Sequence, residues 1–320
     1  MNKLLIHSYT NKGALILTLL VFALISLTCK STNPTTPDAS LDVQLAPPPA
    51  GAGLQIVIDP FTVPSGQEIT RNYYMKLPSA VDIYITKVEI VYNTGSHHCN
   101  VFKTDTIDVP DHVEETFNAI QWESWDMVFA SQRANLNWQL PPGIAIPLKA
   151  HQQIDVQTHY VNANTQQTSN GRGKVIINLW TMPKDSVQSY LGTLFANNRS
   201  IKIPPHSDTT FMKVVRSIPW DVNILLLTGH FHSRGKLFTV KQLSTGNEVY
   251  RNGEWVDPPI QFYNPPLQLR ANEQIAYWTE YYNATNDTIK FGPHVETQEH
   301  SNLFMFFYPG PPDGKAIYDF

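Results

Sequence analysis

Apolar and polar residues alternate over many short segments of the chain. Seven segments combine this alternation with β-branched and aromatic residues: 83–92, 154–160, 174–180, 222–228, 237–243, 274–281 and 303–308. Successive side chains of a strand point to opposite faces, so a period of two predicts half-buried strands. Turn sequences such as Pro141-Pro142-Gly143 and Asn252-Gly253 separate them, and only 185–196 shows a helix-like period. The pattern predicts an all-β fold of antiparallel β-sandwiches.

The length and composition favour two globular domains. The 320 residues exceed one typical domain, and a strand segment ends at Met182-Pro183, so we predict domains over 54–183 and 184–320. An apolar fraction of 42% with 16% charged residues excludes wholesale disorder. The net charge of −4 lacks the basic footprint of a nucleic-acid-binding protein.

The N-terminal residues are typical of an export signal. Lys3 and Lys12 precede an apolar run over 14–27, which is shorter than the roughly 20 residues of a membrane span. The run ends at Thr28-Cys29, which resembles a bacterial lipobox. We therefore expect a signal peptide over 1–28 and lipid attachment at Cys29, with ordinary signal cleavage nearby as the alternative.

A segment rich in serine, threonine and proline follows the signal, and it predicts a flexible tether over 29–53. The expected location is the bacterial cell envelope, where the lipid would anchor the protein to the periplasmic or surface face of a membrane. Cys99 is the one other cysteine, so the exported chain has no disulfide framework and must be stabilised by its cores.

Four of the 11 histidines form two suggestive pairs, His97-His98 and His230-Phe231-His232. His230 and His232 follow an apolar strand, and residues i and i+2 share a face, so both can bind one metal ion. His97 and His98 would point to opposite faces of a regular strand. Both could reach one ion only at a bulge or a strand end, and the preceding Gly95 favours such an irregularity.

Two further histidines complete two sets of three. His159 lies in an alternating strand, and His300 precedes the apolar segment 303–308. The sets are His97, His98 and His159 in the first half, and His230, His232 and His300 in the second. Three imidazoles suit copper or zinc and leave a position open for a small ligand. The remaining His7, His112, His151 and His206 are expected at the surface.

The order and flanks of these motifs resemble the copper type II, ascorbate-dependent monooxygenase family. The matching stretches are Ser96-His97-His98-Cys99-Asn100, Leu140-Pro141-Pro142-Gly143, Thr158-His159-Tyr160, His230-Phe231-His232-Ser233-Arg234-Gly235-Lys236 and Glu299-His300-Ser301-Asn302-Leu303-Phe304. The resemblance covers about residues 55–310. Each motif alone is moderately specific, whereas their order and spacing together are strong.

The resemblance implies two tandem jelly-roll-like sandwiches with two copper ions per chain, which face each other across a solvent-filled cleft. The copper at His97, His98 and His159 would pass an electron. The copper at His230, His232 and a third ligand would bind O2 and abstract hydrogen from the substrate. Ascorbate or another one-electron reductant would supply electrons, and the chain is expected to be a monomer.

One departure concerns the third ligand of the O2-binding copper. The family has a methionine there, and His300 stands at the aligned position. Thioether favours Cu(I), whereas imidazole also supports Cu(II), so the resemblance implies an altered redox poise. Met305 is a thioether alternative, but its odd offset from His300 places it on the opposite face of a strand. His294 is a second alternative.

Another departure concerns the substrate. The peptide-amidating members carry an arginine where Thr228 stands and a substrate-contacting tyrosine where Phe304 stands, while their asparagine is retained as Asn302. Asn302 and Phe304 are therefore the candidate substrate contacts. Loss of the guanidinium and the phenol argues against a peptide C-terminus as substrate.

Three neighbours of the histidines have two interpretations each. Cys99 could be a copper-proximal thiol, although a small buried hydrophobe is the favoured role. Asp155 and Glu299 could orient the ligands, although surface charge is the simpler account. The sequence thus predicts a copper-dependent monooxygenase that hydroxylates a C–H bond of a small or peptide-like substrate. The alternative is a non-catalytic metal- or ligand-binding lipoprotein on the same scaffold.

Overall fold

The computed structural model describes residues 43–320 except 94, 117–124, 163–170 and 313. The expected signal peptide, Cys29 and the first part of the tether lie outside the described residues. Within the described part of the chain, no helix is long and apolar enough to cross a membrane.

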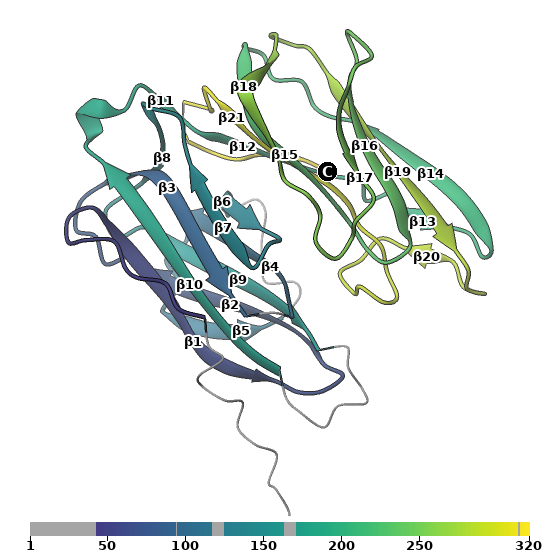
Figure 1. Ribbon diagram of the computed structural model, residues 1–320, viewed down its shortest axis with the longest axis horizontal. Helices are drawn as coiled ribbons and strands as arrows, with labels where there is room; N and C mark the ends of the chain where they lie inside the picture. Colours follow the sequence, from purple (N-terminus) through teal and green to yellow (C-terminus); the bar gives the residue numbers. More distant parts are fainter. Residues whose placement is uncertain (1–42, 94, 117–124, 163–170, 313) are drawn as a thin grey trace, which may run out of the picture. The chain divides into compact units, whose positions relative to one another are not determined.

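The fold is all-β and consists of two tandem jelly-roll-like antiparallel sandwiches, as predicted (Figure 1). All seven predicted segments are strands: β3 (Ile83–Tyr92), β9 (Gln153–Val161), β10 (Gly171–Met182), β15 (Val222–Phe231), β16 (Gly235–Gln242), β19 (Ile275–Asn283) and β21 (Ser301–Tyr308). Buried and exposed residues alternate at the end of β19, over Thr279–Asn283, as a period of two predicts. By contrast, β9, β15 and β21 are buried at nearly every residue, so their β-branched and aromatic residues are the better signal.

The helix-like expectation for 185–196 is wrong. A single 3₁₀ turn at Lys184–Ser186 is followed by the strands β11 (Ser189–Tyr190) and β12 (Gly192–Asn197). Every residue of β12 is buried, so both faces of this strand are covered and no alternation marks it.

The first sandwich packs two sheets over one core. Its other strands are β1 (Gly53–Val63), β2 (Glu68–Lys76), β4 (Ser96–Thr104), β5 (His112–Glu115), β6 (Asp126–Ser131), β7 (Asn135–Gln139) and β8 (Ile144–Leu148). One sheet has the order β1-β10-β3-β8-β11 with β7 beside β3, and the other has the order β5-β2-β9-β4-β6. Val101 and Val156 of the second sheet pack with Ile177 of the first.

The second sandwich has its own core. Its other strands are β13 (Lys202–Ile203), β14 (Ser207–Val214), β17 (Glu248–Asn252), β18 (Gln261–Leu269), β20 (Ile289–Lys290) and β22 (Ile317–Asp319). A sheet of order β18-β15-β21-β12-β22 packs on one of order β14-β19-β16-β17, and β13 pairs with β20. Leu227, Phe238 and Phe307 lie in this core.

Apolar contacts join the two halves beside the histidines. Leu226 of β15 and Phe306 of β21 belong to the hydrophobic cluster of the first sandwich, and the rings of Phe306 and Trp138 lie 5.1 Å apart. The Tyr318 hydroxyl accepts a hydrogen bond from the Met127 amide (2.7 Å) and donates to the Trp125 carbonyl (2.8 Å). These contacts hold β15, β21 and β22 against the first half.

The residues before β1 are also attached to the first sandwich. The Gln55 amide donates to the Leu45 carbonyl (3.0 Å), and the Asn178 amide donates to the Ala46 carbonyl (2.8 Å). These two hydrogen bonds fix the end of the segment that leads into the body.

Gly229 offers a test of the packing that supports the site. A Cβ at Gly229 would lie 2.4 Å from the Phe238 ring, which is closer than real Cβ contacts. Overpacking of this kind costs about 1–3 kcal/mol. We expect Gly229→Ala to lower the free energy of unfolding by about that amount in urea denaturation. Gly253→Ala is the control, because its Cβ would meet no atom closer than 3.5 Å. Equal stability of the two variants would contradict the packing.

Candidate metal centre

The first histidine set is built at a β-bulge. The pairing of β4 with β9 shifts between Ser96 and His98, and His98 then pairs directly with His159. This irregularity, expected from the sequence, leaves His97 at the bulge. The ring centroids of His97, His98 and His159 are 4.9–5.4 Å apart, and their ligand nitrogens lie within 4.8 Å of one another. The three side chains can therefore converge on one ion.

The second set lies where β15 ends and β21 begins. His230 is in β15, His232 follows that strand, and His300 directly precedes β21. The ring of His300 lies 4.5 Å from that of His232 and 5.6 Å from that of His230, and the latter two are 5.2 Å apart. The structure thus brings all three predicted residues together.

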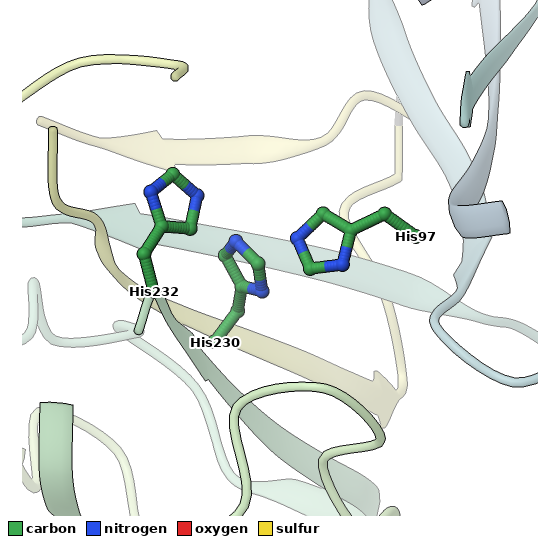
Figure 2. Close-up of side chains that lie close together, drawn as sticks. All are labelled: His97, His230 and His232. Carbon is green, nitrogen blue, oxygen red and sulfur yellow. The ribbon is translucent and has the colours of Figure 1, made fainter. Parts of the chain in front are cut away.

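The two sets adjoin each other through His97. Its ring lies 5.0 Å from His230 and 6.0 Å from His232, and Figure 2 shows His97 pointing toward both. The ligand nitrogens of His97, His230 and His232 lie within 4.8 Å of one another. The resemblance implies sets separated by a solvent-filled cleft, whereas here rings of both sets are neighbours. His300 belongs to neither of these two close trios.

Burial keeps most of these imidazoles neutral. It lowers the pKa of His97, His98, His230 and His300 well below 6.5, and repulsion between neighbouring histidines adds to the effect. For His232 burial lowers the pKa to about 4. Neutral imidazole is the form that binds metal ions. The lowered pKa values therefore favour the neutral form of these rings, which can bind a metal ion.

Two buried nitrogens of the cluster are unpaired. His97 Nε2 and His230 Nδ1 have no hydrogen-bond partner in the described part of the structure. Buried polar atoms without a partner are uncommon because each costs free energy. A metal ion between the rings would satisfy atoms of this kind.

Glu68, at the start of β2, orients one ligand. Its Oε1 lies 2.8 Å from His159 Nε2, so this carboxylate fixes the orientation of the ring. Burial raises the pKa of Glu68, but the hydrogen bond and charge attraction with His159 outweigh this and leave the pKa below its usual value. Sequence reasoning missed Glu68 because no motif marks it. Only the pairing of β2 with β9 brings it to His159.

Glu299 fixes the loop that carries His232. Its two carboxylate oxygens accept hydrogen bonds from the backbone amides of His232 (2.9 Å) and Arg234 (2.8 Å). The Gln298 carbonyl lies 3.0 Å from His232 Nδ1 and can accept a hydrogen bond from Nδ1–H, a tautomer in which Nε2 carries the lone pair that a metal would need.

The surface-charge interpretation of Glu299 and Asp155 is wrong, because both side chains are 0% exposed. Burial raises the pKa of Asp155 well above its usual value and that of Glu299 to about 7. Among these two, only Glu299 contacts a histidine of the cluster by a hydrogen bond that the structure shows.

Cys99 is buried in the first core, so the favoured hydrophobic role agrees with its position. It pairs with Thr158, next to the pair of His98 and His159, and neighbouring residues of a strand face opposite ways. Burial raises the pKa of its thiol to about 12.

Met305 and His294, the alternative ligands, differ in their surroundings. Met305 is buried in the second core, whereas its neighbours Phe304 and Phe306 belong to the first hydrophobic cluster, as the odd offset indicated. His294 is half exposed, with its Nδ1 4.0 Å from Glu68. His112, His151 and His206 are exposed as expected, and His7 lies outside the described residues.

A cavity of about 430 Å³ adjoins the cluster. Five of the six histidines line it, all except His97, together with the expected substrate contacts Asn302 and Phe304. Asn197, Arg199 and Phe195 of the β12 region also line it, and sequence reasoning missed them because that region resembled a helix. Thr228 is not among the lining residues. Its hydroxyl donates to the Pro259 carbonyl at 3.2 Å.

Comparisons with known proteins leave the function open. No family model matches the chain, and no curated protein matches it. Among solved structures, the major capsid protein P2 of bacteriophage PM2 covers 82% of this chain and 100% of its own, at 8% identity and a TM-score of 0.32. PNGF-II covers 81% of this chain and 65% of its own, at 9% identity and 0.27. The match to VP2 of infectious bursal disease virus covers 88% of this chain and 76% of VP2, at 8% sequence identity and a TM-score of 0.19.

The lowered pKa of His232 predicts acid sensitivity of the metal-free protein. Between about pH 6.5 and pH 4 the unfolded chain binds a proton at this residue that the folded chain does not, so stability falls as pH falls. One such histidine contributes a slope of about 1.4 kcal/mol per pH unit. We expect urea denaturation in chelator at about pH 7 and about pH 5 to show a smaller loss for His232→Gln than for the wild type. The exposed His151→Asn serves as control, and an unchanged pH dependence in His232→Gln would contradict the assignment.

Proposed function

We propose that the protein is a copper-dependent monooxygenase, which hydroxylates a C–H bond of a small organic substrate with O2 and a one-electron reductant such as ascorbate. The observation that supports this proposal most is the convergence of six imidazoles from two sandwiches beside one cavity. The resemblance of the histidine motifs to the copper type II family supplies the reaction class.

The residues present fit copper. The donor set consists of imidazoles, which are good copper ligands, and the unpaired nitrogens of His97 and His230 are suited to a metal. His97, His98 and His159 would hold the electron-transfer ion, and His230, His232 and His300 the O2-binding ion. When bound, copper supplies one-electron redox chemistry and an open position for O2.

The chain's own groups orient the ligands and the substrate. Glu68 fixes the ring of His159, and the Gln298 carbonyl fixes the tautomer of His232. Phe304 and Phe195, whose rings stack at 4.8 Å, form an apolar wall of the cavity for the C–H-bearing part of a substrate. The cavity lies next to His230 and His232, where the reacting carbon would have to be.

The overall reaction balances without a further reagent. A C–H bond, O2, two electrons and two protons give a C–OH group and one water. Export and lipid attachment at Cys29 complete the proposal, since the N-terminal sequence supports an envelope location with the body outside the cytoplasm.

Oxygen uptake tests the activity. We expect copper-reconstituted protein to catalyse ascorbate-driven oxygen consumption that rises with a hydroxylatable substrate, as measured with an oxygen electrode. His232→Ala should reduce this rate at least about 100-fold, because it removes a ligand of the O2-binding ion. The exposed His151→Ala should retain the wild-type rate.

Each negative outcome has a definite meaning. Protein that takes up no copper after reconstitution would overturn the proposal. Protein that binds copper but shows no uptake above that of free copper, with any tested substrate, would favour the alternative of a non-catalytic metal-binding lipoprotein.

A further inference from the structure

The cavity face of the second sandwich presents an ordered set of side chains. His230 of β15 pairs with Asn302 of β21, and Asn302 pairs with Asn197 of β12. Paired residues share a face, and neighbouring strands are about 4.8 Å apart. This row therefore extends about 10 Å from the metal ligand His230 to Asn197.

The two asparagines of this row have unused hydrogen-bonding capacity. Asn302 and Asn197 are each 5% exposed, and neither Oδ1 has a hydrogen-bond partner in the described part of the structure. Gln132 also lines the cavity, and its buried Oε1 likewise has no hydrogen-bond partner in the described residues. Because unpaired buried acceptors are costly, they indicate a ligand with N–H or O–H donors.

An aromatic wall leads from this row to a cation. Phe195 stacks on Phe304 and lies 5.8 Å from the Phe320 ring, and the guanidinium of Arg199 lies 3.8 Å from the centroid of Phe320. Arg199 comes two residues after Asn197 and lines the same cavity. It is the one Lys, Arg, Asp or Glu among the described lining residues, and no ion pair of the described structure includes it.

The guanidinium of Arg199 is suited to binding the carboxylate of a ligand. Its planar set of N–H donors matches a carboxylate through two parallel hydrogen bonds. The positive charge of Arg199 would also repel the ammonium group of an amine ligand in this part of the cavity. The aromatic wall between Arg199 and His230 matches an apolar body rather than a second charge.

We propose that the cavity binds a small organic carboxylate with an aromatic or aliphatic body, whose carboxylate pairs with Arg199. An N–H or O–H group of the ligand would donate to Asn302 or Asn197. That such a ligand is the substrate rests on the proposed monooxygenase function, whereas its binding does not depend on the metal.

Binding to the metal-free protein tests this inference separately from catalysis. Phenylbutyrate, phenylbutanol and phenylbutylamine share one body and differ in charge, and isothermal titration calorimetry gives the Kd of each. We expect phenylbutyrate to bind most tightly. Arg199→Gln should weaken its binding at least about tenfold and leave the alcohol unchanged, because the variant removes a charge-assisted hydrogen bond.

Matched variants refine the result. Arg199→Lys keeps the charge but loses the planar donors, so it should give an intermediate Kd. Arg216→Gln removes an exposed arginine that does not line the cavity and should bind phenylbutyrate as the wild type does. The inference is overturned if phenylbutyrate binds no more tightly than phenylbutanol, or equally to wild type and Arg199→Gln. Failure of copper loading or oxygen uptake would leave these results untouched and would contradict the proposed function alone.

Discussion

Six imidazole rings gather where the two β-sandwiches meet, four of them buried and those of His98 and His300 partly buried, and the arrangement of the neighbouring strands serves this cluster. Burial holds most of these rings neutral and leaves nitrogens of His97 and His230 without a hydrogen-bond partner in the described structure. Apolar packing of Leu226 and Phe306 against the first half keeps them together. The unpaired nitrogens of His97 and His230 have a physical explanation if an ion occupies the cluster, because the ion supplies the missing interactions.

Ordinary strand geometry delivers these rings to one place. The bulge in β4 allows the side chains of His97 and His98 to lie on the same side of the sheet. His230 and His232 share a side because they are two residues apart along the chain. Two carboxylates, the partly buried Glu68 and the buried Glu299, then fix the orientation of groups in the cluster. Glu68 holds the ring of His159, and Glu299 holds the backbone that carries His232. Five of the rings line the cavity beside them.

The sequence predicts the strands and the bulge, which depend on neighbouring residues, and misses contacts between residues that are far apart along the chain. The seven predicted segments are strands, which their β-branched and aromatic residues favour, and Gly95 precedes the bulge. Glu68 and Arg199 reach the site through long-range strand pairing or through a strand without alternation, so no motif reveals them. The burial of Asp155 and Glu299 and the contact between the two histidine sets also depend on tertiary packing.

We propose that imidazoles alone hold copper in this protein. Copper analysis with X-ray absorption of the ascorbate-reduced protein tests it most directly. The account predicts two copper ions per chain with nitrogen and oxygen neighbours only, and a sulfur neighbour that appears in His300→Met, where the thioether takes the place of that imidazole. Absence of bound copper, or a sulfur neighbour in the wild type, would contradict the account.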